Sequence, residues 1–120
     1  IIERAALSEP GRTLNKQHWA SAIDTVGGQM LANELEQTTH GGTVAACGLA
    51  DSAGLTTTVM PFITQKVRLQ GVDTVQATYA VRKQAWSRLA TLMPESFYPQ
   101  ATQEITLDQG TEYAARLLDN

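Results

Sequence analysis

Two apolar stretches that end in glycine carry the side chains that could do chemistry. The first is Ala22-Ile23-Asp24-Thr25-Val26-Gly27-Gly28, and the second is Thr43-Val44-Ala45-Ala46-Cys47-Gly48. Each is typical of a short strand that ends in a tight turn, where glycine allows close approach of the backbone to a ligand. In open α/β sheets, ligands bind beyond the carboxyl ends of the strands. The two turns are therefore the first candidates for a binding site.

Cys47 is the first candidate for catalysis, and its chemistry depends on what lies beside it. Free cysteine is among the most buried residue types, so a buried small hydrophobic residue is the favoured interpretation. A nucleophilic Cys47 needs a nearby base, and His18 and His40 are the two histidines of the chain. One cysteine with two scattered histidines does not have the spacing of a zinc site. The sequence therefore predicts no catalytic residue and no metal ligand.

Asp24 is a carboxylate inside an apolar strand, and such a group must find hydrogen-bond donors. Two interpretations stay open: Asp24 fixes the following turn or a neighbouring helix end, or it contacts a ligand. Asp73 occupies a similar place after a third apolar stretch, and there the structural interpretation is favoured. We expect Asp24 to accept hydrogen bonds from the backbone.

The elements that position these residues follow from the hydrophobic periodicity. A helix predicted over Gln29–Thr39 separates the two strands, which makes a strand–helix–strand unit of a parallel sheet. Gly41 or Gly42 is expected to end this helix, and Val67–Val75 is predicted to form a third strand. The other expected elements are a short helix opened by Pro61, a helix from Tyr79 to Met93 capped by Thr78 with Trp86 in the core, a weak strand over Ala101–Leu107 and a last helix capped by Thr111.

The composition limits the class of protein. The 120 residues are 42% hydrophobic with a formal net charge of −3, which is typical of a globular domain and argues against a nucleic-acid-binding surface. No apolar stretch has the length of a membrane span, and a lone cysteine fits the reducing cytosol. No G-x-G-x-x-G motif occurs, so the usual phosphate-binding turn of a dinucleotide fold is absent. The chain begins at Ile1 without Met and stops after an apolar helical pattern, so we expect it to be part of a longer protein.

Several consecutive blocks of the chain resemble one family, the YhdH/YhfP-type quinone oxidoreductases (acrylyl-CoA reductases). These belong to the zinc-independent medium-chain dehydrogenase/reductase superfamily. The resemblance runs in order through nearly the whole chain. Its blocks are Trp19–Gly27, Gly42–Ala50, Thr57–Ile63 and Val67–Val75, followed by Arg82, Ala85-Trp86, Leu89 and Pro94–Tyr98.

The resemblance implies a fold and a place within it. The expected class is α/β: half of a Rossmann doubly wound parallel sheet, with strands 4, 5 and 6 of the order 3-2-1-4-5-6 and flanking helices. Residues 1–100 would be the C-terminal half of the NADP-binding Rossmann domain. Residues 101–120 would be a return segment towards a catalytic domain that the chain lacks.

The resemblance also implies an activity. The parent enzyme would use NADPH to reduce the activated carbon–carbon double bond of an acryloyl thioester or enone, or a quinone, in the cytoplasm. The fragment alone is expected to be inactive, and its small-molecule substrate belongs to the full-length parent. Members of the superfamily commonly pair the strand 6 edge, so we expect a homodimer through Val67–Val75, with no nucleic acid or membrane as partner. The alternative is a stand-alone α/β binding or protein-association module.

The resemblance further implies which residues contact the cofactor. The chain departs from the family pattern at Thr64, Gln65 and Lys66, so no cofactor contact is expected from these three positions. The residues expected to contact the cofactor are Thr25, Val26, Gly27, Gly48, Leu49, Ala50, Phe62 and Ile63.

Overall fold

The structure is a computed structural model that describes residues 3–11 and 14–118. By its internal contacts the chain forms two compact units, Ile1–Gln76 and Ala77–Asn120. The assignment of residues 1–100 and 101–120 to two parts of a parent protein is a different division, and it stays a prediction.

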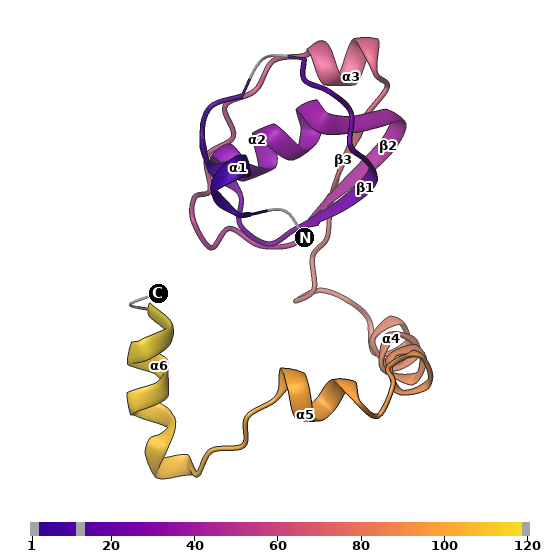
Figure 1. Ribbon diagram of the computed structural model, residues 1–120. Coiled ribbons are helices and arrows are strands. Elements are labelled where there is room, and N and C mark those ends of the chain that lie inside the picture. The colour runs from indigo at the N-terminus through magenta and orange to yellow at the C-terminus, as the bar shows by residue number, and fades with distance from the viewer. Residues whose placement is uncertain (1–2, 12–13, 119–120) are drawn as a thin grey trace. The chain divides into compact units, whose positions relative to one another are not determined.

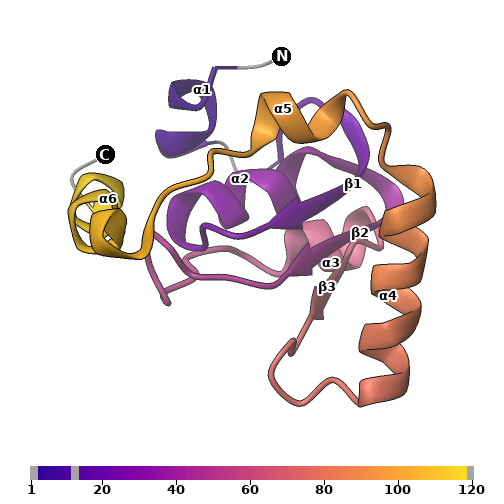
Figure 2. The ribbon, with the colours of Figure 1, turned by 90° about the horizontal axis from the view of Figure 1, so that it is seen from below.

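The first unit is built on a parallel sheet of three strands in the order β1-β2-β3, which lie side by side in Figure 2. The strands are β1 (Trp19–Asp24), β2 (Thr38–Ala46) and β3 (Arg68–Gly71). Helix α2 (Gly28–Gln37) connects β1 to β2 (Figure 1). This architecture confirms the predicted α/β class with a parallel sheet and flanking helices, as half of a Rossmann-type domain.

The third strand is shorter than the predicted stretch Val67–Val75. Its pairing with β2 runs from Thr43↔Arg68 to Ala46↔Gly71, and Ala46 is the last residue of β2. Beyond Gly71 the strand has no ladder partner except at one point, where Val72 N donates to Ala46 O at 2.9 Å. The regular strand therefore ends where its neighbour ends.

A small apolar core lies between α2 and the sheet. Leu31 and Leu35 of α2 pack with Val44 of β2 and with Val67, which precedes β3. Leu35 and Val44 are fully buried. The spacing of Leu31 and Leu35 places both on one face of α2, so the helix covers the sheet with its apolar side.

Helix α2 ends earlier than predicted, and its expected terminating glycine has another role. The helix stops at Gln37, and Thr38 already has extended backbone and begins β2. Gly41 has a φ of 77° within β2, where the pairing jumps from Trp19↔Thr38 to Ser21↔Thr43. The left-handed residue therefore accommodates a bulge in the strand instead of capping the helix. The β-branched Thr38 ends the helix, and its Oγ1 donates to Glu34 O at 2.7 Å.

A buried amide of α2 helps to hold the segment before β1. Helix α1 (Ala5–Ser8) has no buried residue of its own. Asn33 of α2 is 1% exposed, and its Nδ2 donates to Leu7 O at 2.7 Å and to Glu9 O at 2.8 Å. Its Oδ1 accepts from Gly11 N at 3.2 Å. The hydrogen bonds of Asn33, together with the bond that His18 N donates to Gln37 O at 2.8 Å, hold the described part of this segment to α2.

Helix α3 (Met60–Thr64) begins with Pro61 in its first turn, as predicted. Pro61 O accepts from Val67 N at 3.2 Å, and Gln65 O accepts from Gly41 N at 2.8 Å. Both bonds lie where β2 and β3 begin, so α3 lies at the amino end of the sheet, as Figure 1 shows.

The second unit is helical. It contains α4 (Tyr79–Leu92), α5 (Phe97–Ala101), a 3-10 turn (Leu107–Gln109) and α6 (Gly110–Leu118). Thr78 caps α4 as predicted, because its side chain accepts from Val81 N. The predicted strand over 101–107 is wrong: α5 extends into its first residue and the 3-10 turn takes its last. Thr106, in a capping box with Gln109, takes the capping role expected for Thr111, which lies inside α6.

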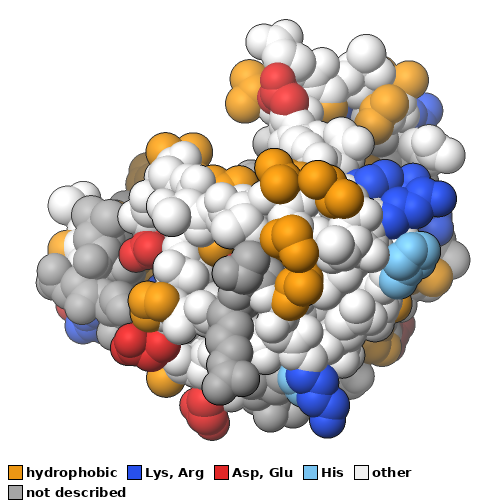
Figure 3. Space-filling model, turned by 90° about the horizontal axis from the view of Figure 1, so that it is seen from above, with side chains coloured by type: hydrophobic (Ala, Val, Ile, Leu, Met, Phe, Trp, Pro, Cys, Tyr) orange, Lys and Arg blue, Asp and Glu red, His pale blue; other side chains and the backbone are white. Residues whose placement is uncertain are grey.

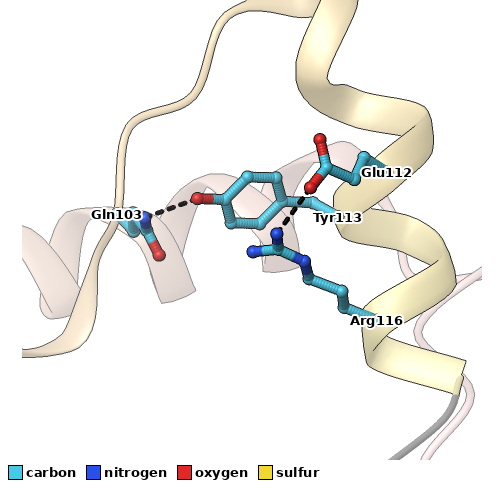
Figure 4. Close-up of polar contacts among 4 residues, drawn as sticks. All are labelled: Gln103, Glu112, Tyr113 and Arg116. Carbon is cyan, nitrogen blue, oxygen red and sulfur yellow. Dashed lines mark hydrogen bonds and ion pairs between the residues drawn. The ribbon is translucent and has the colours of Figure 1, made fainter.

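Local contacts hold α6 to the chain before it. Gln103 Nε2 donates to the hydroxyl of Tyr113 at 2.8 Å, and Arg116 pairs with Glu112 one turn earlier (Figure 4). The guanidinium carbon of Arg116 lies 5.2 Å from the centroid of the Tyr113 ring. All of these contacts are exposed, so each contributes little stability.

The prediction that Trp86 lies in the core is wrong for this structure. Trp86 is 68% exposed, and no residue of α4 is buried. Several large hydrophobic side chains reach the surface in both units, and Figure 3 shows hydrophobic groups exposed on one face of the molecule. The spacing of apolar residues in a sequence predicts an apolar stripe on a helix such as α4. It does not predict whether another part of the protein packs against that stripe.

Candidate functional site

The turns after β1 and β2 are joined directly to each other. Ala50 N donates to Thr25 O at 3.2 Å, and Asp51 N donates to Val26 O at 2.9 Å. An isolated parallel bridge between Gly27 and Ser52 extends this pairing beyond the strands. The structure therefore brings together the six predicted turn residues, Thr25, Val26, Gly27, Gly48, Leu49 and Ala50.

Asp24 holds the first of these turns. It is 1% exposed, and its Oδ1 accepts from Val26 N at 3.2 Å and from Gly27 N at 3.0 Å. Its Oδ2 accepts from Gly27 N at 3.0 Å as well. The prediction that Asp24 accepts backbone hydrogen bonds is confirmed, and these bonds satisfy a carboxylate that would otherwise be costly to bury.

The glycines of the turns are required by the packing of one turn on the other. A Cβ on Gly48 would lie 2.5 Å from Thr25 O, and a Cβ on Gly27 would lie 2.2 Å from Ser52 O. Gly27 also has a φ of 77°, a conformation that other residues rarely adopt. The close approach that the sequence suggested for a ligand is thus already used by the protein backbone.

An open pocket of about 560 Å³ lies at the carboxyl ends of β2 and β3. Its walls are mostly apolar and small, which suits a flat ring that must approach the backbone closely. Sequence reasoning missed the β3 side of this pocket. The signal was present, because Gly71-Val72-Asp73 ends the third parallel strand and carboxyl ends of parallel strands meet at one edge. The lining residues are Ala46, Cys47, Gly48, Leu49, Gly71, Val72 and Asp73.

Cys47 lines this pocket and is exposed, so the interpretation as a buried residue is wrong. It follows Ala46, the last residue of β2, whose side chain packs against the core. Its thiol donates to Asp24 O at 3.3 Å. His40 lies seven residues earlier on β2, and His18 precedes β1, so both histidines belong to the amino ends of the strands. The described part of the chain therefore brings neither histidine to the thiol.

Phe62 and Ile63 do not join the other predicted cofactor residues. Both belong to α3 at the amino end of the sheet. Phe62 packs against the core, and Ile63 is 72% exposed. The structure therefore separates the predicted set into six residues at the carboxyl edge and two at the opposite edge.

Two other site classes find no support among the described residues. Residues 3–11 and 14–118 contain no group of three or more His, Cys, Asp or Glu side chains placed to hold a metal ion. Within the same part of the chain, the helices are too short or too polar to cross a membrane.

One carboxyl group of α2 has unusual electrostatics. Burial, together with the smaller effect of the negative charge of Asp24, raises the pKa of Glu34 to about 7. Glu34 Oε2 is buried and has no hydrogen-bond partner in the described part of the chain. Burial also raises the pKa of Glu36 on the same helix. Two carboxyl groups of α2 therefore favour the protonated form more than free glutamate does.

Comparison with protein-family models gives no match. Curated proteins do match. The chain is 54% identical over its whole length to the probable acrylyl-CoA reductase AcuI of Escherichia coli K12, and it covers 37% of that protein. It is 45% identical over 78% of its length to the acrylyl-CoA reductase AcuI of Ruegeria pomeroyi, covering 29% of it. It is 34% identical over 91% of its length to the putative quinone oxidoreductase YhfP of Bacillus subtilis, covering 33% of it.

Solved structures match the fold closely. The YhdH oxidoreductase of Salmonella enterica in complex with NADP aligns with a TM-score of 0.93 at 51% identity, over 99% of this chain and 36% of that chain. YhdH of E. coli K-12 with bound NADPH aligns at 0.91 with 52% identity, over 98% of this chain and 36% of that chain. YhfP of B. subtilis with bound NAD aligns at 0.87 with 33% identity, over 99% of this chain and 37% of that chain.

The fold is therefore a Rossmann-type half domain of the kind found in nicotinamide-dependent oxidoreductases. The chain is homologous to a continuous stretch of the acrylyl-CoA reductases and YhfP-type quinone oxidoreductases, and it spans about a third of the length of these relatives. The family resemblance read from the sequence blocks is confirmed.

Replacing Asp24 with leucine tests the role of its carboxylate. Asp24→Leu keeps a branched side chain of similar shape but leaves the N–H groups of Val26 and Gly27 without an acceptor. We expect the free energy of unfolding to fall by about 1–3 kcal/mol, measured by urea denaturation. Asp24→Asn retains Oδ1, the acceptor for both N–H groups, so its free energy of unfolding should fall by less than that of Asp24→Leu. Equal losses for the two variants would contradict the assignment.

The raised pKa of Glu34 predicts a pH-dependent stability. The folded chain binds the Glu34 proton more tightly than the unfolded chain, so the free energy of unfolding should fall as pH rises from about 4.5 to about 7. Glu34→Gln cannot ionise and should flatten this part of the profile, with a remaining slope from Glu36. The exposed Glu95→Gln variant is the matched control. A Glu34→Gln profile parallel to that of the wild type would show that Glu34 does not carry the effect.

Proposed function

We propose that this chain forms the nicotinamide side of an NADPH site in an oxidoreductase that reduces an activated carbon–carbon double bond or a quinone. The observation that supports this most directly is the apolar pocket at the carboxyl ends of β2 and β3. Its position is where open α/β sheets bind ligands. The relatives solved with NADP, NADPH or NAD share the fold of nearly the whole chain.

In this proposal the protein orients the cofactor, and bound NADPH supplies the hydride. Leu49, which is 64% exposed, and Val72, which is 43% exposed, offer apolar surface to a ring. Gly71 adds no side chain that would keep a ring away from the backbone, since a Cβ there would meet no atom within 4 Å. We include Thr25, Val26, Gly27 and Ala50 as the turn that supports this wall. Cofactor contacts from Phe62 and Ile63 would require a ligand that reaches the opposite end of the sheet, so we leave these two residues out.

The single cysteine of the chain provides a direct test of occupancy. Cys47 is exposed and lines the pocket, so a bound nicotinamide should slow its alkylation by iodoacetamide, followed by intact mass spectrometry. We expect slowing by several-fold at millimolar NADPH. The affinity should be weak, because half of a site must still offset a loss of translational and rotational freedom of about 4–15 kcal/mol.

Two controls make this measurement specific. 2′-Phospho-ADP-ribose lacks the nicotinamide and should protect less than NADPH. The double variant Cys47→Ser, Ser87→Cys moves the thiol to α4, where NADPH should have no effect. Identical alkylation rates of Cys47 with and without several millimolar NADPH would overturn the proposal.

We further propose that the 120-residue chain does not turn over substrate by itself. The chain contains no G-x-G-x-x-G turn to hold the pyrophosphate. Among the described residues, neither histidine lies beside the Cys47 thiol, and the carboxylate that lines the pocket is that of Asp73. NADPH oxidation with acryloyl-CoA or a quinone should equal that of a heat-denatured control, and a clear excess over that control would contradict this expectation.

The outer edge of β3 supports a second proposal, a homodimer through the stretch 67–75. In the sheet that residues 3–11 and 14–118 form, this strand pairs only with β2, and an unpaired edge can recruit another chain. A twofold antiparallel pairing of this edge would extend the sheet across two copies. The same surface would serve a stand-alone association module, which is the alternative function. Alkylation protection by NADPH separates the two, because an association module has no reason to bind the cofactor.

The dimer can be tested with a proline at an outward-facing position. Val72 N donates to Ala46 O, and backbone groups alternate along a strand, so the N–H groups of Leu69 and Gly71 face the outer edge. Leu69→Pro should remove a donor from the dimer and shift the mass measured by light scattering towards the monomer. Leu69→Ala keeps the N–H group and is the control. A wild-type chain that is monomeric at tens of micromolar would refute the proposal.

A further inference from the structure

The turn after β3 is held by a carboxylate in the same way as the turn after β1. Asp73 Oδ1 accepts from Val75 N at 2.8 Å and from Gln76 N at 3.0 Å. Asp24 accepts from the N–H groups two and three residues further along, and Asp73 does the same. Two of the three strand ends at this edge are thus followed by a turn closed on an aspartate side chain.

The two aspartates differ in burial, and this separates their roles. Asp24 is 1% exposed and lies beneath the joined turns, so its loss affects the folded unit. Asp73 is exposed and does not belong to the apolar core of the described residues. Gly71, Val72 and Asp73 line the β3 side of the pocket. The hydrogen bonds of Asp73 therefore hold the segment that directly follows this wall.

We infer that Asp73 is a positioning residue of the proposed cofactor site, acting through the backbone of residues 72–76. This inference rests on the proposed function. Beyond Val72 the wall has no ladder partner, since β2 has already ended at Ala46. The two hydrogen bonds to Asp73 replace that missing support. Without them the segment would have to be ordered by the ligand, which weakens binding.

The inference distinguishes hydrogen bonding from charge. An asparagine offers the same Oδ1 acceptor at the same distance from the backbone and can form the same turn. Asp73→Asn should therefore behave as the wild type, whereas Asp73→Ala should not. A direct electrostatic role in holding the ligand would make the two variants equally impaired.

The experiment compares the wild type with Asp73→Ala, Asp73→Asn and a charge-matched control, Asp108→Ala, which lies outside the pocket on the 3-10 turn. Amide hydrogen exchange of Val75 and Gln76, measured by NMR, reports whether the turn is formed. The NADPH concentration that half-protects Cys47 from alkylation reports the affinity of the site. Thermal denaturation reports the stability of the fold.

We expect Asp73→Ala to speed exchange at both amides and to raise the half-protecting NADPH concentration by about three- to tenfold. Its melting midpoint should fall by no more than that of Asp108→Ala. Asp73→Asn should have the amide exchange rates and the half-protecting NADPH concentration of the wild type. An unchanged half-protecting NADPH concentration in Asp73→Ala would overturn the inference while leaving the proposed function intact. The same holds if Asp73→Asn weakens NADPH protection as much as Asp73→Ala does. Absence of protection in the wild type would overturn the proposed function, and the inference with it. Unchanged exchange in Asp73→Ala would overturn the inference by itself.

Discussion

The carboxyl edge of the sheet depends on the buried carboxylate of Asp24. Burying a charge without donors is strongly unfavourable, and two backbone N–H groups of the following turn meet that requirement. These bonds set the path of the chain from β1 into α2, and with it the direction of the carbonyl groups of Thr25 and Val26. The same carbonyls accept the N–H groups that place the turn after β2. One side chain thus positions two turns, the second through the first.

Polar anchors matter in this unit because its apolar core is small. A short chain buries a limited fraction of its surface, so hydrophobic packing alone leaves little margin. Asn33 holds the segment before β1, Thr38 ends α2, and Asp24 and Asp73 hold turns. Each of these side chains replaces the support that a longer helix or a further strand would give. The residues with the largest structural consequences are consequently polar.

The site combines two turns that are held by many hydrogen bonds with one segment that is held by few. The turns after β1 and β2 are locked by mutual hydrogen bonds, and their glycines are in contact with backbone atoms of the opposite turn. The β3 side continues past the last ladder pair and is held by one exposed aspartate. A ligand at this edge would meet a preformed wall on one side and a locally anchored one on the other. The second wall therefore depends on its own local hydrogen bonds and not on the core.

The sequence by itself determined the class of fold and the position of its strands, because the apolar stretches and the helix between them are local patterns. It also predicted that Asp24 accepts backbone hydrogen bonds, since a carboxylate inside an apolar strand needs donors, while it left a ligand contact of Asp24 open. The family relationship was likewise readable from the order of the sequence blocks. Helix ends and strand ends were less well determined: Thr38 ended α2 before Gly41 could, and the length of β3 followed from that of β2.

Only the tertiary structure decided which side chains share a surface. Cys47 follows directly after a residue that packs against the core, yet it is exposed although its residue type favours burial. Phe62 lies at the other end of the sheet from the turns, and Trp86 has no surface over it. Asp73 joined the pocket because a third parallel strand ends beside β2. Burial and proximity depend on contacts between segments far apart along the chain, and periodicity within one segment carries no information about those contacts.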